Sequence, residues 1–153
     1  MTEIQKFAPT FVAQSTQGPI DLASLRGKKV VLYFYPKDNT SGCTLEGQNF
    51  AALHDEFVQN DCVVLGVSRD SLKSHQNFCT KQGFPFALIT DPDEALCQAY
   101  DVMKLKKMYG REYMGVERST FLIDREGRIA QEWRKVKVPG HVQAVLDAVI
   151  ALG

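Results

Sequence analysis

Buried strands and amphipathic helices alternate in the hydrophobic pattern of this chain. Residues 29–35 consist of one lysine followed by an unbroken run of valine, leucine and aromatic residues, which is typical of a strand buried on both faces. Similar runs at residues 62–68 and 85–90 predict two further strands. Phe50 and Phe57 recur at helical spacing after the first strand, and predict a helix that extends to residue 57 and that Thr40 or Ser41 can cap.

Weaker signals predict the elements on either side of this centre. Turn residues before residue 21 indicate an N-terminal hairpin or extended arm, followed by a short helix at residues 22–25. Ser71 is expected to cap a helix that ends near Gly83. Asp91 or Asp93 is expected to begin another helix. Its inward-facing side chains would be Leu96, Tyr100 and Met103.

The last third of the chain predicts a hairpin and a closing helix. Residues 104–117 are polar and basic, so we interpret them as a loop or a frayed segment. Residues 118–124 and 128–134 flank the turn signature Arg-Glu-Gly and predict a β-hairpin. Apolar residues at helical spacing after Gly140 predict a final amphipathic helix.

This order of elements calls for an α/β domain with a mixed central sheet, mainly parallel and completed by an antiparallel hairpin, flanked by helices. A thioredoxin-like fold with an N-terminal hairpin extension satisfies it, although the order alone leaves other α/β sheets open. A chain of 153 residues is long enough for one domain with a sizeable core, so we expect residues 1–153 to form a single domain.

Charge and cysteine content narrow the function classes. Eighteen basic and eighteen acidic residues cancel, which gives no electrostatic case for nucleic-acid or membrane binding. Residues 1–6 lack the apolar stretch of a signal peptide, and no run approaches membrane-spanning length. Four dispersed cysteines do not form the pattern of a secreted disulfide scaffold. We therefore expect a cytoplasmic protein with reduced thiols.

Cys43 is the strongest candidate for chemistry. The pattern places it in the first turn of the helix that follows the central strand, on the inward stripe beside Glu46. Backbone N–H groups and the positive end of the helix dipole both favour thiolate over thiol at this position. The residue pattern thus predicts a prepared sulfur nucleophile.

The residues around Cys43 resemble a known active site. Pro36-x-x-x-Thr40-x-x-Cys43 resembles the peroxiredoxin motif, and the longer string from Tyr33 to Glu46 is similar to the bacterioferritin comigratory protein branch, also called PrxQ. The similarity runs through most of the chain. It includes Ala8-Pro-x-Phe11, Gly66-Val-Ser68, Phe84-Pro-Phe86 and Arg118-Ser-Thr-Phe-Leu-Ile-Asp124.

The resemblance implies a role for each matching residue. Cys43 would be the peroxidatic cysteine, which attacks the terminal peroxide oxygen and becomes a sulfenic acid. Thr40 would hold the thiolate and the peroxide by its hydroxyl, Pro36 would shield the site from water, and Arg118 would supply positive charge. The implied peroxide-binding residues are Thr40, Gly42, Cys43, Glu46 and Arg118.

The resemblance also implies a thiol peroxidase of hydrogen peroxide and organic hydroperoxides that needs no cofactor or metal. Thioredoxin, or else glutaredoxin, would be its reductant, and a monomer is the usual state in this branch. Negative charge develops on the leaving oxygen and is stabilised by aligned hydrogen-bond donors, which an arginine guanidinium and helix N–H groups provide. A shift to full thiolate gains only about tenfold at neutral pH. Most of the catalysis must therefore come from positioning the peroxide.

The resolving cysteine departs from the commonest pattern of the branch. Many members carry it five residues after the peroxidatic cysteine, where this chain has Gln48. A second subgroup carries it on the following helix, and Cys79 lies 36 residues after Cys43. The resemblance thus implies an intramolecular Cys43–Cys79 disulfide, which requires both helix starts to unwind because disulfides need Cα atoms within about 7 Å.

Several alternatives remain open from the residues alone. Cys62 and Cys97 fit a structural role in the core, although Cys97 or an external thiol is the alternative to Cys79. If Cys79 does not resolve, a one-cysteine peroxidase follows. A dithiol oxidoreductase is disfavoured because Thr40 stands where its first sulfur would be. The remaining rival is a non-catalytic thioredoxin-fold binding or chaperone module.

Two further interpretations concern charged and metal-binding residues. Glu46 is as well suited to bind the N-terminus of its own helix as to contact the peroxide. The three histidines, at positions 54, 75 and 141, show no ligand spacing with one another or with a cysteine. We therefore expect no metal site.

Overall fold

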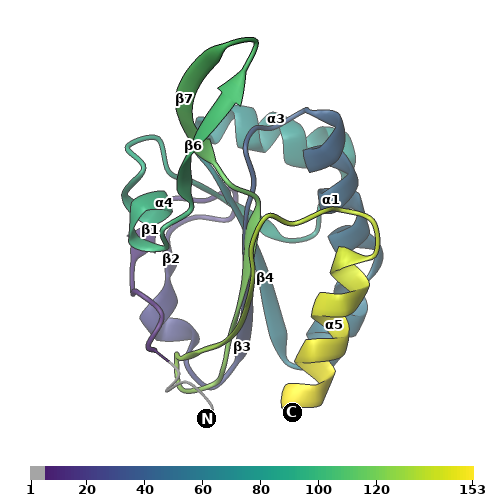
Figure 1. The fold of residues 1–153 in the computed structure, drawn as a ribbon. Helices are drawn as coiled ribbons and strands as arrows, with labels where there is room; N and C mark the ends of the chain where they lie inside the picture. The colour runs from purple at the N-terminus through teal and green to yellow at the C-terminus, as the bar shows by residue number, and fades with distance from the viewer. Residues whose placement is uncertain (1–5) are drawn as a thin grey trace.

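A five-stranded mixed sheet lies at the centre of the computed structural model, which describes residues 6–153 (Figure 1). The residues at the start of the chain, on which part of the signal-peptide argument depends, fall outside this range. The strand order is β5-β4-β3-β8-β9. The bounds are β3 (Lys29–Phe34), β4 (Cys62–Ser68), β5 (Ala87–Thr90), β8 (Ser119–Ile123) and β9 (Ile129–Trp133).

The pairing within the sheet confirms the predicted mixture. Strands β3, β4 and β5 are parallel, and β8 and β9 add as an antiparallel hairpin on the other side of β3. All six residues of β3 are buried. The hydrophobic run predicted this for residues 30–34, whereas Lys29 is buried with its Nζ atom donating to the carbonyl of Val149 at 3.0 Å. Alternate side chains of this strand therefore supply both faces of the core.

Helices and short segments cover the two faces of the sheet (Figure 1). Helices α1 (Ser41–Ala52), α2 (His54–Gln59), α3 (Leu72–Gln82) and α5 (His141–Leu152) contribute to the core cluster that contains Val31 and Tyr33. The opposite cluster contains Leu32 and Phe34. It is covered by β1 (Val12–Ala13), β2 (Ile20–Asp21), the 3-10 helix η1 (Leu22–Leu25) and α4 (Ala95–Ala99). The predicted N-terminal hairpin and short helix are thus confirmed.

The prediction of a loop at residues 104–117 is wrong. This segment forms strands β6 (Met103–Met108) and β7 (Arg111–Val116), an antiparallel hairpin that projects beyond the central sheet (Figure 1). Tyr109 and Gly110 form its two-residue turn with φ of 51° and 76°, the backbone that suits a tight hairpin. The two strands pack mostly against each other, so few of their side chains are buried. The buried apolar pattern that predicted the strands of the central sheet is therefore weak here.

Two helices differ from their predicted extents. The helix expected to extend to residue 57 breaks at Leu53, whose φ of −102° and ψ of 5° separate α1 from α2. Helix α4 is shorter than expected, so Met103 lies in β6 rather than on its inner face. Asp91 still supports α4, because its carboxylate accepts hydrogen bonds from the backbone N–H groups of Leu96 and Cys97 at 3.0 and 2.8 Å.

The helix that carries Cys79 begins and ends as predicted. The side chain of Ser71 accepts a hydrogen bond from the backbone N–H of Ser74 and caps α3. Gly83 ends the helix in the left-handed region at φ 69°, where glycine carries no steric penalty. The boundaries of α3 are thus set by local sequence.

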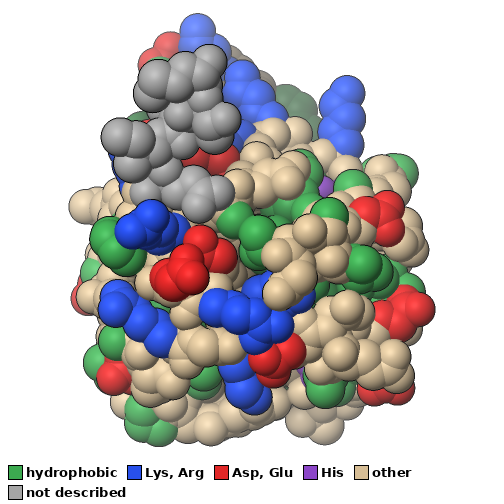
Figure 2. Space-filling view, turned by 90° about the horizontal axis from the view of Figure 1, so that it is seen from below, with side chains coloured by type: hydrophobic (Ala, Val, Ile, Leu, Met, Phe, Trp, Pro, Cys, Tyr) green, Lys and Arg blue, Asp and Glu red, His purple; other side chains and the backbone are tan. Residues whose placement is uncertain are grey.

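The surface opposite the β6–β7 hairpin carries both signs of charge. Figure 2 shows intermingled basic and acidic side chains on the face seen from below, where α5 ends. Arg125 pairs there with Asp61 and donates to the carbonyl of Gly153. Among residues 6–153, no helix has both the length and the apolar character that a bilayer crossing requires.

Candidate active site

Cys43 lies where the central strand passes into α1. Strand β3 ends at Phe34, and a loop of residues 35–40 leads to the helix, whose third residue is Cys43. The cysteine is only 2% exposed and belongs to the core cluster beneath α1. The buried strand β3 and the start of α1 together place the sulfur at the carboxyl edge of the parallel strands, where ligands bind in α/β folds.

Arg118 reaches this sulfur from a distant part of the chain. It immediately precedes β8, which runs antiparallel to β3 so that Ser119 pairs with Phe34. This register brings the start of β8 beside the end of β3. The Arg118 Nη2 atom lies 3.4 Å from the Cys43 Sγ atom. A fixed positive charge therefore faces the sulfur, as an anionic nucleophile requires.

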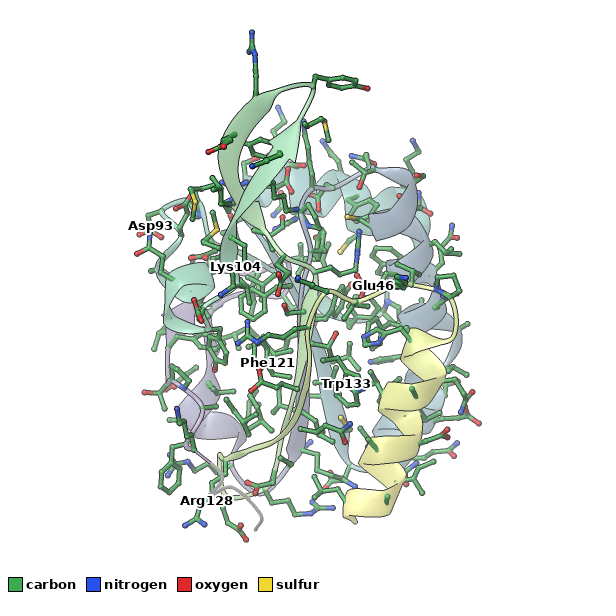
Figure 3. All side chains as sticks on the ribbon, viewed as in Figure 1. Glu46, Asp93, Lys104, Phe121, Arg128 and Trp133 are labelled. Carbon is green, nitrogen blue, oxygen red and sulfur yellow. The ribbon has the colours of Figure 1, made fainter. Side chains whose placement is uncertain are left out.

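The same guanidinium also binds Glu46. Its Nη1 atom donates to Glu46 Oε1 at 2.6 Å, so Arg118 lies between the carboxylate and the sulfur. Glu46 is labelled in Figure 3, where α1 faces the sheet. Its side chain is fully buried, and Oε2 has no hydrogen-bond partner among residues 6–153. Burial raises the pKa of Glu46 to about 7, although the charge and hydrogen bond of Arg118 oppose this rise.

This buried carboxyl predicts a pH-dependent loss of stability. Unfolded Glu46 ionises near its ordinary pKa of 4.5, whereas the folded protein holds the proton up to a pKa of about 7. Folding is thus favoured below this interval and loses that contribution as pH rises through it. We expect the free energy of unfolding of the wild type, relative to that of Glu46→Gln, to fall by about 3 kcal/mol across the interval.

Urea unfolding of both proteins from about pH 4.5 to about pH 8 measures this difference. His141 also titrates within or near this interval, because burial lowers its pKa to about 4. It is present in both proteins, so its contribution cancels in the comparison. Parallel stability curves for the two proteins would contradict the prediction.

Gly42 gives the guanidinium room beside the cysteine. A Cβ atom at this position would lie 3.2 Å from Arg118 Nη2, which is tighter than ordinary van der Waals contact. Gly47, five residues further along α1, similarly makes room for Phe84, whose ring would lie 2.4 Å from an added Cβ. The first of these glycines shapes the site, and the second brings the segment after α3 against α1.

Thr40 does not cap α1 with its side chain, contrary to the capping role considered for it. It occupies the N-cap position in an extended conformation, but its hydroxyl donates to the carbonyl of Lys37 at 2.9 Å. No side chain among the described residues caps this helix. The first N–H groups of α1 therefore remain available beside Cys43 for an incoming oxygen. Pro36 lies half-buried at the beginning of the same loop.

A buried polar network behind this loop was not predicted. His75 Nδ1 lies 2.7 Å from Asp38 Oδ2, and Tyr35 donates its hydroxyl to Asp38 Oδ1 at 2.6 Å. Potential ligand atoms of Asp38, Asp70 and His75 lie within 4.8 Å of one another. They bond to protein groups instead, so the network has the character of a structural contact rather than an open metal site. No local spacing signals it, because Asp38 and His75 are 37 residues apart.

The four cysteines are free thiols in very different settings. Cys79 is half-buried on the side of the sheet that holds Cys43, and its sulfur lies 3.8 Å from Thr16 Oγ1. Burial raises the pKa of Cys79. It raises the pKa of Cys62 to about 12. Cys97 is fully buried in the opposite core cluster. Of the three other cysteines, Cys79 is thus the one that combines exposure with the correct face.

The position of Cys79 corrects one expectation. It lies three residues before the end of α3, not near its beginning. Approach to Cys43 would therefore require unwinding at the start of α1 and at the end of α3. The expectation that both helix starts unwind is wrong for α3.

Comparisons with known proteins agree with this geometry. A model of the AhpC/TSA family matches residues 4–132. Peroxiredoxin Bcp of Xanthomonas campestris pv. campestris is 60% identical over 125 residues, which cover 82% of this chain and 78% of that protein. Peroxiredoxin Bcp of Bacillus subtilis is 49% identical over 146 residues, which cover 95% and 93%.

A solved structure extends the comparison to the fold. The Xanthomonas campestris bacterioferritin comigratory protein, described with its alkyl peroxide reduction activity, has a TM-score of 0.88 at 53% identity. The match covers 92% of this chain and 90% of that chain, and it confirms the predicted thioredoxin-like fold. The chain belongs to the AhpC/TSA family and is a peroxiredoxin, a thiol peroxidase of the bacterioferritin comigratory protein branch.

Proposed function

We propose that this peroxiredoxin reduces hydrogen peroxide and organic hydroperoxides with Cys43, resolves the oxidised sulfur with Cys79 and is recycled by thioredoxin. The observation that carries the proposal is the 3.4 Å contact between Arg118 Nη2 and Cys43 Sγ at an uncapped helix start. The alkyl peroxide reduction named for the Xanthomonas campestris relative supports the substrate class.

The first step is nucleophilic displacement at the peroxide. The Cys43 thiolate attacks the terminal oxygen of ROOH, so that an S–O bond forms while the O–O bond breaks. Sulfur gives up two electrons and becomes a sulfenic acid, and RO⁻ takes a proton from solvent to leave as an alcohol or water. Arg118 and the free N–H groups of α1 stabilise the charge on the leaving oxygen. Pro36 limits the access of water, and Thr40 turns its hydroxyl from Lys37 toward the peroxide.

The second step joins the two cysteines. The Cys79 sulfur attacks the Cys43 sulfur, so that an S–S bond forms and the S–O bond breaks. The departing hydroxide combines with the proton from Cys79 and leaves as water. Because the cysteines lie on different helices, the first turn of α1 and the last turn of α3 unwind for this step.

The third step returns the protein to its dithiol form. A thioredoxin dithiol exchanges with the Cys43–Cys79 disulfide and becomes oxidised in its place. No step requires a metal or a cofactor, because sulfur supplies and recovers all the electrons. We propose that the protein acts as a cytoplasmic monomer.

A one-cysteine mechanism is the alternative. The observation that favours it is the raised pKa of Cys79, which follows mainly from burial and makes this thiol a weaker attacking group in the folded state. In that case an external thiol, such as glutathione acting with glutaredoxin, reduces the sulfenic acid. Cys97 is a poor substitute because it is fully buried on the other side of the sheet.

Replacement of Cys79 separates these mechanisms. We expect Cys79→Ser to consume one equivalent of peroxide as fast as the wild type, yet to form no intramolecular disulfide and to lose turnover with thioredoxin. Cys97→Ser is the matched control and should behave as the wild type. Stopped-flow mixing measures the first step, and mass spectrometry of peroxide-treated protein identifies the crosslink. A Cys43–Cys97 crosslink, or undiminished turnover of Cys79→Ser with thioredoxin, would refute the resolving role.

A further inference from the structure

A single carboxylate connects the two segments that carry the reactive cysteines. Asp38 lies in the loop before α1, five residues before Cys43. Its Oδ2 atom lies 2.7 Å from His75 Nδ1 and accepts a hydrogen bond from Ser74 Oγ at 2.8 Å. Both partners belong to α3, and His75 precedes Cys79 by four residues, about one helical turn.

This contact is buried and fully hydrogen-bonded. The side chains of His75 and Asp38 are 0% and 1% exposed. His75 Nε2 lies 2.9 Å from the carbonyl of Ile89, which only accepts, so this nitrogen carries a hydrogen. The short contact between His75 Nδ1 and Asp38 requires another proton, held by one of the two side chains. Buried contacts of this kind are costly to break because an unpaired polar group would remain.

The end of α3 is held by a different kind of contact. Gln82 accepts a hydrogen bond from Gln48 of α1 at 2.9 Å, and this pair is exposed to solvent. Phe84 packs against Gly47 just beyond the helix. Exposed hydrogen bonds at a helix end beside a glycine cap open more readily than a buried, fully hydrogen-bonded contact. The turn that contains Cys79 can therefore unwind while His75 stays in place.

We propose that Asp38 and His75 are positioning residues for disulfide formation: their contact, here called the Asp38–His75 clamp, remains closed while the helix ends unwind and holds the two cysteine segments together. This inference rests on the proposed Cys43–Cys79 disulfide. If the clamp opens, the two segments are still joined through the sheet, where Phe34 pairs with Val67, nine residues before Cys43 and twelve before Cys79. That path between the sulfurs is 21 residues long, whereas the path through the clamp is nine. A shorter path leaves less entropy to lose when the sulfurs meet.

The difference in path length gives the size of the effect. Loop-closure entropy predicts that opening the clamp slows disulfide formation by roughly three- to fourfold. The sulfenic acid of Cys43 then persists longer, and a second peroxide oxidises it to sulfinic acid more often. In this reaction an S–O bond forms and the O–O bond of the second peroxide breaks. We therefore expect over-oxidation at a peroxide concentration lower by about the same factor.

The test compares Asp38→Asn and His75→Gln with Ser71→Ala. Ser71→Ala removes the cap of α3 but leaves the clamp contacts intact, so it controls for a general loosening of this helix. Each protein is mixed with peroxide in a quenched-flow instrument, and mass spectrometry gives the ratio of Cys43–Cys79 disulfide to Cys43 sulfinic acid. This ratio is set after Cys43 has been oxidised, so neither a slower first step nor a smaller folded fraction changes it.

We expect the clamp variants to lower this ratio roughly three- to fourfold, with Ser71→Ala equal to the wild type within experimental error. An unchanged or higher ratio in the clamp variants, or an equal loss in Ser71→Ala, would overturn the clamp while leaving the Cys43–Cys79 disulfide established. No such disulfide in the wild type would overturn both proposals. If neither clamp variant folds, Ser74→Ala removes one hydrogen bond to Asp38 at a half-buried position and should lower the ratio below that of Ser71→Ala. Equal ratios in these two variants would then overturn the clamp.

Discussion

Cys43→Ser is expected to lose peroxide consumption to below detection. A serine hydroxyl stays protonated at neutral pH, so the variant offers no anionic nucleophile to the peroxide. The contact with Arg118 does not compensate, because the guanidinium stabilises a charge that the hydroxyl never carries. Stopped-flow mixing with hydrogen peroxide, followed by Trp133 fluorescence and by titration of remaining thiols, measures the loss.

Two controls make this result specific to the sulfur of residue 43. Cys62→Ser replaces another buried cysteine, whose pKa burial raises to about 12, and should keep rapid single-turnover consumption. Serine and cysteine have nearly the same shape, so Cys43→Ser should retain the thermal midpoint of the wild type within a few degrees. Rapid consumption that survives in folded Cys43→Ser would exclude Cys43 as the peroxidatic residue.

Arg118→Met should lower the second-order rate of Cys43 oxidation by about 10²–10³-fold, the usual cost of removing one aligned donor from a developing oxyanion. Methionine keeps much of the side-chain length but offers neither the charge nor the N–H groups that lie 2.6 Å from Glu46 and 3.4 Å from Cys43. Arg118→Lys should recover only part of the rate, because one ammonium does not replace a two-pronged fork.

The same substitution also removes the partner of a fully buried carboxyl. Loss of one member of a buried ion pair typically costs about 3–5 kcal/mol, so Arg118→Met should unfold at lower urea concentration, most clearly above pH 7 where Glu46 is ionised. The double variant Arg118→Met with Glu46→Gln removes the stranded charge. We expect it to regain stability without regaining rate. Recovery of both would mean that Arg118 acts on stability alone.

Much of the fold follows from local patterns in the sequence. The unbroken apolar run of β3 predicts its burial, and the helical spacing after it places Cys43 in the first turn of α1. Ser71 and Gly83 mark the ends of α3. The β6–β7 hairpin escaped prediction although Met103 and Leu105 alternate with lysines, a pattern typical of strands. The pattern of buried apolar runs did not reveal this hairpin, because its side chains are weakly buried: Leu105, for example, is 58% exposed.

The sequence by itself determined that a cysteine stands at a helix start after a buried strand, because strand and helix periodicities are set by neighbouring residues. Only the tertiary structure decided which groups meet that sulfur. Arg118 arrives through the antiparallel register of β8 with β3, and Asp38 meets His75 because α3 packs beside the loop. Strand order and helix packing minimise the free energy of the whole core, so no local spacing encodes these contacts. The burial that raises the pKa of Glu46 is likewise produced by several segments packed together and not by any one of them.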